Sequence, residues 1–338
     1  MKVDIEVVAK KAGLSRSTVS RVIRNYPGVK ESTRQKVEKA IKELNYEVNS
    51  IARNLRQKKS NTIGIIFGKV FDLFFSAIAK TIENIANKAG YNVILCYSDD
   101  DAEKELASLR ILNSSRVEGI ILVASGKNSE YIKTLISSGT KVVLLDRLIE
   151  GVNCDAVLID NFKGGYLATK HLLEQGYKRV AIINGSMDFM TGKERLNGYL
   201  KALDEFGIES DKNLIKNGCF TKKFGAEATI EILKYSDKRP DAIFTTNLDL
   251  TLGALDILYE QKIQIPEQIG IVGFDDSDWS HLLKPKLTVI DYPLYQFGAT
   301  AAELLIRKIQ NKNNDFSDKP VIVKLDTYLI VKESSIKK

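Results

Sequence analysis

The chain has 338 residues, 44% of them hydrophobic, which exceeds one average domain and suits a small module with one or two larger α/β units. Its net charge of +7 is uneven: residues 1–60 hold 15 basic and 6 acidic side chains, and the other 278 residues sum to −2, as in a nucleic-acid-binding module on a near-neutral body. The N-terminus has no apolar signal-peptide core and no apolar run approaches the ~20 residues of a membrane span, so we expect a soluble, cytoplasmic protein.

Residues 5 to 23 have the spacing of a helix-turn-helix. Val8 and Ala9 fall on one face of a first helix, and Gly13 ends it because the tight turn needs a residue that tolerates a positive φ. Ser15 is a good N-cap for a second helix. The buried stripe of that helix is Val19 and Val22. Its outward face carries short polar and basic groups that suit base edges and phosphates in a major groove, namely Arg16, Ser17, Ser20 and Arg21.

The next segment predicts a third helix. From Ser32 to Leu44, Val37, Ala40 and Ile41 recur at helical spacing and can close a small three-helix core. A basic helical hairpin without a DNA partner is the alternative, but the third helix and the charge of the first 60 residues favour a DNA-binding domain.

A short basic segment follows Tyr46. Asn49 can cap one helix over about residues 50–56, with Ala52 and Leu55 on one face. A helix of so few residues is not stable alone in water, so it should fold only against a partner. The nearby basic residues, such as Arg53, indicate that this partner is DNA. A disordered basic linker is the alternative.

From Thr62 on, apolar runs alternate with amphipathic stretches. Runs such as I-G-I-I-F, V-I-L-C-Y and V-V-L-L-D are typical of strands covered on both faces of a parallel sheet. The pattern then restarts with V-A-I-I-N, A-I-F-T-T and I-G-I-V-G-F-D-D, with helices near residues 164–174, 193–206, 224–234 and 250–261. We therefore expect a small all-α helix-turn-helix head plus an α/β body of two doubly wound parallel-sheet subdomains, with a ligand cleft between them.

Polar residues collect where the predicted strands end, on the side that faces this cleft. Each could equally be a helix cap or turn residue, but together they favour a hydroxyl-rich small ligand. Aromatic residues in the nearby loops could stack on a sugar ring, although isolated aromatics are more often core. The polar residues are Asp146, Arg147, Asp160, Asn161, Asn247, Asp275 and Asp276, and the aromatics are Phe74, Phe75, Phe220 and Trp279.

The chain has no strong enzyme motif. It lacks G-x-x-x-x-G-K-[ST], H-E-x-x-H and G-x-S-x-G, and neither His171 nor His281 has a metal-ligand partner at suitable spacing. The three cysteines, Cys96, Cys154 and Cys219, also lack metal-type spacing, which indicates buried or incidental thiols. We therefore expect no enzyme, metal or cofactor.

Over its whole length the chain resembles bacterial transcriptional regulators of the lactose-repressor (LacI/GalR) family. The similar stretches include V-A-K-K-A-G-L-S-R-S-T-V-S-R-V-I, V-K-E-S-T-R-Q-K-V-E-K-A-I-K-E-L-N-Y, E-R-L-N-G-Y and G-F-D-D followed by P-K-L-T-V-I. The resemblance implies a periplasmic-binding-protein-like body. It implies a DNA-binding domain at 1–48, a hinge helix or linker at 49–60 and an effector-binding and dimerisation domain at 61–338. Within the last we expect an N-subdomain of about 61–160 and 292–321, and a C-subdomain of about 161–291 and 322–338.

The resemblance also assigns site residues. It makes Arg195 the arginine that grips the effector, Asp275 the aspartate across the pocket, and Leu55 a wedge into the minor groove. The implied DNA-binding residues are Arg16, Ser17, Thr18, Arg21, Asn25, Arg53 and Leu55. The implied effector-binding residues are Asp72, Phe74, Arg147, Asp160, Arg195, Phe220, Asn247, Asp275 and Trp279.

Four positions depart from the family pattern. Asn247 is followed by Leu248, with the acid displaced to Asp249. Val48 replaces a proline before the hinge, Glu6 replaces a tyrosine that contacts phosphate, and Tyr292 replaces a glutamine.

We therefore expect a homodimeric, ligand-responsive repressor of a sugar or sugar-acid operon that binds a palindromic operator. The last residues, K-E-S-S-I-K-K, lack the apolar heptads of a tetramerising tail. Two arginines in one pocket favour an acidic effector, unless Arg147 pairs with Asp146 or Asp160. The alternatives are a sugar-binding receptor with an incidental basic head, and a global catabolite regulator that takes a phosphocarrier protein as corepressor. The latter would present basic residues on the helix at 299–310, where Glu303 and Arg307 stand.

Overall fold

The computed structural model describes residues 4–23, 26–46, 60–69, 73–234, 239–277, 280, 282–311 and 319–337. The chain divides into two compact units, residues 1–59 and residues 60–338, which we call the head and the body.

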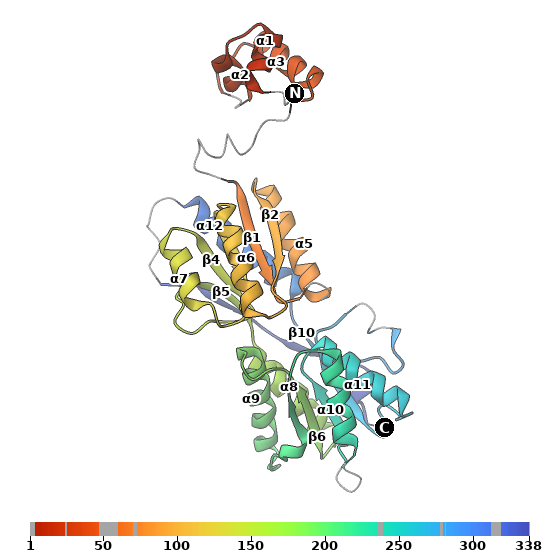
Figure 1. Ribbon diagram of the computed structural model, residues 1–338. Helices are drawn as coiled ribbons and strands as arrows, with labels where there is room; N and C mark the ends of the chain where they lie inside the picture. Colours follow the sequence, from red (N-terminus) through yellow and green to blue (C-terminus); the bar gives the residue numbers. More distant parts are fainter. Residues whose placement is uncertain are drawn as a thin grey trace. The chain divides into compact units, whose positions relative to one another are not determined.

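The described residues of the head form the three helices that the sequence predicts, α1 (Ile5–Ala12), α2 (Arg16–Ile23) and α3 (Glu31–Glu43) (Figure 1). Asp4 caps α1 by accepting two backbone N–H groups, and Gly13 ends it with a φ of 65°. The backbone N–H of Thr18 donates to Ser15 Oγ at 3.2 Å, so Ser15 caps α2. The helices share a small apolar core of Val8, Ala9, Val19, Val22, Val37 and Ala40.

The first half of the body is a parallel six-stranded sheet in the order β11-β5-β4-β3-β1-β2. Its strands are β1 (Thr62–Phe67), β2 (Asn92–Tyr97), β3 (Gly119–Leu122), β4 (Lys141–Leu145), β5 (Asp155–Ile159) and β11 (Ile322–Leu325). Helices α5 (Leu73–Lys88) and α12 (Leu294–Gln310) cover one face, and α6 (Ala102–Ser114) and α7 (Ser129–Ser137) cover the other (Figure 1).

The second half repeats this plan with the order β12-β10-β9-β8-β6-β7, in which only β12 runs antiparallel to its neighbour. The strands are β6 (Val180–Asn184), β7 (Ile215–Asn217), β8 (Ala242–Thr245), β9 (Gly270–Phe274), β10 (Thr288–Asp291) and β12 (Tyr328–Ile330). Helices α8 (Asn161–Glu174) and α9 (Met190–Glu205) cover one face, and α10 (Lys222–Leu233) and α11 (Leu248–Glu260) cover the other. Short 3₁₀ helices lie at Lys212–Leu214 and Glu333–Ser335.

One subdomain boundary differs from the prediction. Residues 322–325 were expected in the C-subdomain, but β11 pairs with β5 of the first sheet, Ile322 opposite Ala156. The chain passes to the second sheet only after Leu325, before Tyr328. Residues 322–325 and 328–330 both have strand-forming sequences, so local pattern does not decide which sheet each of them joins. Residues 322–325 pair with the otherwise unpaired edge of β5.

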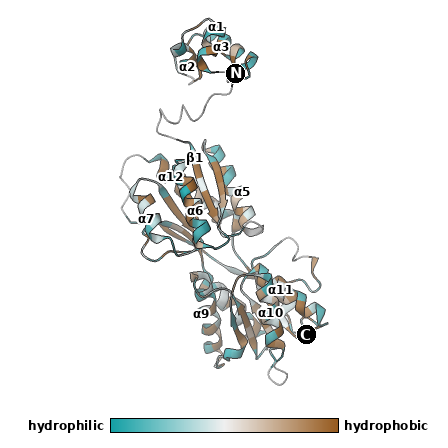
Figure 2. Cartoon of the chain, viewed as in Figure 1, coloured by the Kyte–Doolittle hydropathy of each residue, from teal (hydrophilic) through white to brown (hydrophobic). Residues whose placement is uncertain are grey.

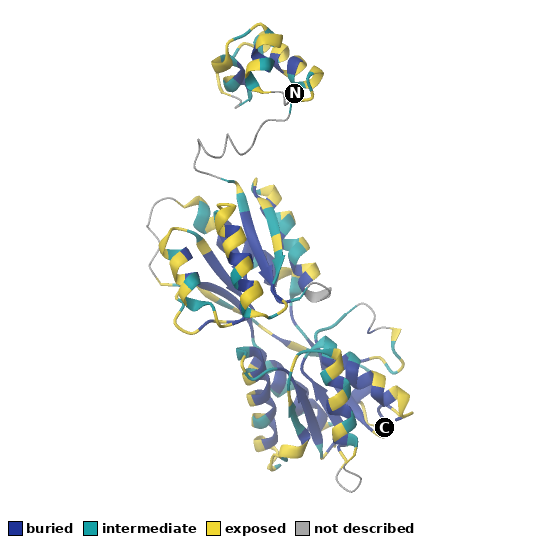
Figure 3. Cartoon of the chain, in the orientation of Figure 1, coloured by how far each residue is buried: buried dark blue, intermediate teal, exposed yellow. Residues whose placement is uncertain are grey.

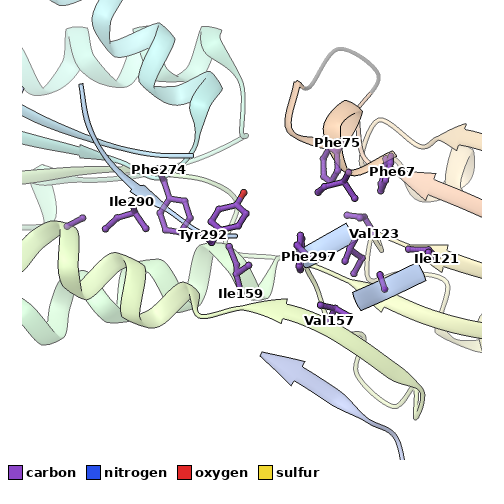
Figure 4. Packing of buried hydrophobic residues seen from close by; sticks show 14 of the residues in the cluster. Phe67, Phe75, Ile121, Val123, Val157, Ile159, Phe274, Ile290, Tyr292 and Phe297 are labelled. Atoms are coloured by element: carbon purple, nitrogen blue, oxygen red, sulfur yellow. The ribbon is translucent and has the colours of Figure 1, made fainter. Parts of the chain in front are cut away.

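Apolar residues fill the inner strands of both halves, which appear mostly brown in Figure 2 and dark blue in Figure 3, whereas the edge strand β2 is only partly buried. The two sheets share one continuous buried cluster. Figure 4 shows Phe274 and Ile290 of the second sheet beside Tyr292, and Phe67, Phe75 and Phe297 in the first half. Packing across this cluster holds the cleft-facing ends of both sheets in place.

Helices α8 and α9 approach closely because glycine stands at their crossing. A Cβ on Gly165 would lie 2.2 Å from the carbonyl oxygen of Arg195, a backbone atom that cannot move aside alone. We expect Gly165→Ala to lower the free energy of unfolding by about 1–3 kcal/mol through overpacking, measured by urea denaturation. Helix propensity alone predicts that the substitution raises the free energy of unfolding, because alanine is more favourable than glycine in a helix interior by about 1 kcal/mol. Increased stability would therefore contradict this account of the crossing.

Candidate functional site

The outward face of α2 carries the predicted DNA-binding side chains. Arg16, Ser17 and Arg21 are exposed and Thr18 is half-buried, while Val19 and Val22 lie beneath them in the head core. Ser15 Oγ lies 2.8 Å from both Ser17 Oγ and Thr18 Oγ1. Two basic groups thus flank short hydroxyls on one helix face, a suitable arrangement for base edges and phosphates. Asn25, Arg53 and Leu55 lie outside the described residues.

A cavity in the body is lined by side chains from both halves. They come from the segments that follow strands and begin helices, where ligands bind in doubly wound folds. Its free volume is about 50 Å³, room for a few water molecules, so the lining side chains occupy most of the cleft. The lining residues are Lys69, Phe75, Asp100, Asp146, Arg147, Thr191, Arg195, Phe220, Asn247, Asp275 and Tyr292.

Asp146 and Asp275 occupy equivalent places in the two halves. Asp146 follows β4 with a φ of 69°, and Asp275 follows β9 with a φ of 75°. Each backbone N–H donates to the neighbouring strand, to Val157 O and Ile290 O respectively, both at 2.9 Å. Left-handed backbone is uncommon outside glycine and concentrates at functional sites. Both carboxylates are thereby aimed from their strand ends at the cavity.

Arg147 is buried and paired with carboxylates. Its Nη1 donates to Asp100 Oδ1 at 2.7 Å, and its Nε to Asp146 Oδ2 at 3.3 Å. Its guanidinium carbon lies 3.9 Å from the centre of the Phe189 ring in the second half. Of the two partners considered from the sequence, the structure therefore selects Asp146 and not Asp160, and adds Asp100.

Arg195 lies on the opposite wall and is also buried. Its Nε donates to Asn161 Oδ1 at 2.8 Å, its Nη1 donates to the carbonyl oxygen of Thr246, and it stacks 3.8 Å from the Phe274 ring centre. These contacts fix the plane of the guanidinium group at the cavity wall. Such a preoriented fork suits ligand oxygens.

Asp275 and Tyr292 form a hydrogen-bonded pair beside Arg195. The Tyr292 hydroxyl donates to Asp275 Oδ1 at 2.8 Å. Burial raises the pKa of the Asp275 carboxyl, and the Arg195 guanidinium and the Tyr292 hydroxyl oppose that rise. Burial and the neighbouring carboxylate raise the pKa of Tyr292 well above its ordinary value. Tyr292 therefore stays a hydroxyl donor to Asp275.

Asp160 is not among the residues that line the cavity. Its carboxylate accepts the backbone N–H of Lys163 at 3.0 Å as the N-cap of α8, and pairs with Lys324 at 3.0 Å. The helix-cap alternative holds at this position because the first turn of α8 has unsatisfied N–H groups within reach. Asn247 combines both roles, since it caps α11 and lines the cavity.

Phe220 lines the cavity as predicted and needs Gly185 beside it, where a Cβ would lie 2.0 Å from its ring. Asp72 and Trp279 lie outside the described residues, and so does the side chain of Phe74. The prediction for these three stays open.

Lys69 is a lining residue that the sequence prediction missed. Its Nζ donates to Asp249 Oδ2 at 2.9 Å and to the carbonyl oxygen of Phe220, so a lysine of the first half bridges to two groups of the second. Asp249 is the displaced acid noted in the sequence. Asp100, Thr191 and Tyr292 were also missed as pocket residues, although Lys69 and Asp100 follow strands in the way that defined the other candidates.

The described part of the chain holds no set of three His, Cys, Asp or Glu side chains arranged to bind a metal ion. Among the same residues, no helix combines the length and apolar character needed to cross a membrane.

Comparison with known families decides what this head and body are. Residues 4–49 match the family described as bacterial regulatory proteins, lacI family, and residues 60–332 match periplasmic binding proteins and sugar binding domain of LacI family. The chain belongs to the LacI family. It is a DNA-binding transcriptional regulator with a sugar-binding type of domain, so the resemblance is confirmed. The alternative of a receptor with an incidental basic head is wrong, because the head itself matches the LacI regulatory domain.

Full-length relatives of this LacI-family chain are regulators of transcription. The HTH-type transcriptional repressor PurR of Vibrio atlanticus is 34% identical over 331 residues, which cover 96% of this chain and 98% of that protein. Catabolite control protein A of Priestia megaterium is 33% identical over 94% of this chain and 96% of its own length. The solved structure of a transcriptional regulator CelR–cellobiose complex covers 98% of this chain and 99% of its own, with 30% identity and a TM-score of 0.73. The predicted fold class is confirmed.

Proposed function

We propose that this LacI-family regulator is a homodimeric repressor of a carbohydrate-utilisation operon, controlled by a small sugar bound in the body's cleft. It acts in the cytoplasm on a palindromic operator and catalyses no reaction. The observation that carries the proposal is the cavity between the two halves, where the fixed guanidinium of Arg195 stands beside Asp275. An arginine fork and a carboxylate offer donors and acceptors to adjacent hydroxyls of one ring.

The charges around the cavity favour a neutral ligand over the acidic one expected from the sequence. Each cationic side chain in the lining already has an acidic neighbour. Arg147 is paired with Asp100 and Asp146, Lys69 with Asp249, and Arg195 interacts electrostatically with Asp275. A carboxylate or phosphate ligand would have to displace one of these acids, whereas hydroxyl groups can bond to both members of a pair.

Ligand binding must move the two halves or their side chains. A pyranose does not fit in about 50 Å³, and Lys69 holds the halves together across the cleft. We propose that binding moves the two halves relative to each other, and that this movement alters how the hinge segments, residues 49–60, present the two heads to the operator. Such coupling is reciprocal and typically amounts to ~1–3 kcal/mol.

We expect neutral mono- or disaccharides to raise the melting temperature of the full-length protein in a thermal-shift screen. A ligand present at about 100 times its Kd adds about 2.7 kcal/mol to the free energy of unfolding, because it binds only the folded state. The screen includes matched uronates, aldonates and sugar phosphates. Stabilisation by these acids, with no response to any neutral sugar, would reject the neutral-ligand proposal. A shifted operator affinity in the presence of the hit then tests the regulatory proposal.

A global catabolite regulator with a phosphocarrier corepressor is the second candidate. Its support is the 33% identity to Catabolite control protein A. Such a regulator should present basic residues on α12 to its corepressor. Here α12 exposes the acidic Glu303 as well as the basic Arg307, which counts against this candidate. Operator affinity that rises with an added phosphocarrier protein, and not with any sugar, would favour this candidate.

A further inference from the structure

An ion pair in the head joins α1 to the first residue of α2. Arg16 Nη1 lies 3.1 Å from Glu6 Oε1, and both side chains are exposed, by 57% and 68% respectively. The backbone N–H of Glu6 is itself held at 2.9 Å by Asp4, the cap of α1. Glu6 is thus placed by a capped helix end, and Arg16 stands at the N-terminal end of the helix whose outward face reads DNA.

Stability does not explain this pair, because exposed ion pairs contribute little to folding. Its effect is on the arginine itself. The guanidinium group has five N–H donors in a rigid fork, and the Glu6 bond occupies Nη1, so other donors can still reach a base. Fixing one edge of the fork limits the directions in which the remaining edge can point.

We propose that Glu6 is a positioning residue for DNA specificity, which aims Arg16 at a guanine in each half-site. An arginine bonds a guanine through its O6 and N7 acceptors, a contact that depends on the plane of the fork. The Glu6 carboxylate also disfavours complexes in which Arg16 leaves it for a phosphate, because the unpaired negative charge would then face the DNA backbone. This role of Glu6 rests on the proposed operator binding, and it identifies a residue that increases the base specificity of that binding.

The same head offers a matched control. Lys11 Nζ lies 3.1 Å from Glu43 Oε2, an exposed ion pair of equal length that joins α1 to α3 instead of α2. Glu43→Gln and Glu6→Gln remove the same charge from the same small domain. Only Glu6→Gln removes the partner of Arg16. A general effect of the domain's charge would therefore change DNA binding equally in both variants, whereas a positioning effect would appear only in Glu6→Gln.

The test is selection from randomised duplex DNA with the full-length wild type, Arg16→Ala, Glu6→Gln, Glu43→Gln and the Glu6→Gln/Arg16→Ala double variant. The base preference lost in Arg16→Ala identifies the guanine that Arg16 contacts. The affinity of each protein is then measured by fluorescence anisotropy for the selected site, for the site with that guanine replaced, and for random DNA.

We expect Glu6→Gln to reduce discrimination at that guanine by about 3- to 10-fold, with Glu43→Gln unchanged. In the Arg16→Ala background, Glu6→Gln should have no further effect on that base. Unchanged discrimination in Glu6→Gln, or equal losses in Glu6→Gln and Glu43→Gln, would overturn the inference while operator binding stands. If the wild type enriches no common sequence, the proposed function fails and the inference fails with it.

Discussion

Arg21→Ala should remove site-specific DNA binding and leave ligand binding by the body intact. Arg21 is exposed on α2 next to the buried Val22, so its side chain extends from the outward face and does not support the head core. One good arginine–base contact is worth ~1–3 kcal/mol, and a dimer loses two of them on a palindrome. We therefore expect a loss of ~2–6 kcal/mol, which is about 30-fold to about 20,000-fold in affinity for the selected operator.

A mobility-shift titration at one fixed salt concentration measures this loss, because phosphate contacts make every DNA affinity depend on salt. Lys39→Ala is the matched control, since Lys39 is an exposed basic residue on α3 rather than on α2. It should weaken specific and random DNA alike, and only slightly. Operator affinity of Arg21→Ala that remains within twofold of the wild type would contradict the role of Arg21.

Local patterns predicted the elements because each depends on neighbours in sequence. Val19 and Val22 mark the buried side of α2 through helical spacing alone, and Gly13 and Ser15 mark the turn through their backbone and capping preferences. The inner strands of the body were equally visible, since β3, β5, β6, β8 and β9 are short, mostly apolar runs that are buried throughout. The edge strands β2, β7, β11 and β12 are only partly buried.

The ion pairs of the cleft between residues far apart in sequence could not be predicted in this way. Arg147 bonds Asp100, 47 residues earlier, and Lys69 bonds Asp249, 180 residues later. Only the fold brings such residues together, because no periodicity connects them. For the same reason Asp160 was assigned to the pocket. Its position after a strand fits a ligand contact and a helix cap equally well, and the structure shows it as the cap of α8.

Arg195→Ala should abolish the ligand response of the body and strongly destabilise it. The arginine is buried, and its removal leaves Asn161 Oδ1 and the carbonyl oxygen of Thr246 without their donor. It also removes the positive charge that opposes the burial-raised pKa of Asp275. Breaking a buried charged network typically costs ~3–5 kcal/mol, which we expect as the loss in free energy of unfolding.

The pH dependence separates this account from simple loss of packing. A carboxyl whose pKa in the folded state is raised above its ordinary value of 3.8 binds more protons when folded than when unfolded, so folding gains stability as the pH falls. Without Arg195 the pKa of Asp275 should rise further, so the stability gap between variant and wild type should narrow as the pH falls from 7 towards 4. Urea denaturation across this range measures the gap.

Arg179→Ala is the control, because Arg179 is about one-third exposed and pairs with Asp211 at 3.2 Å. This substitution should lower the free energy of unfolding by no more than about 1 kcal/mol. A gap for Arg195→Ala that is constant with pH would show that Asp275 does not depend on Arg195 for its charge.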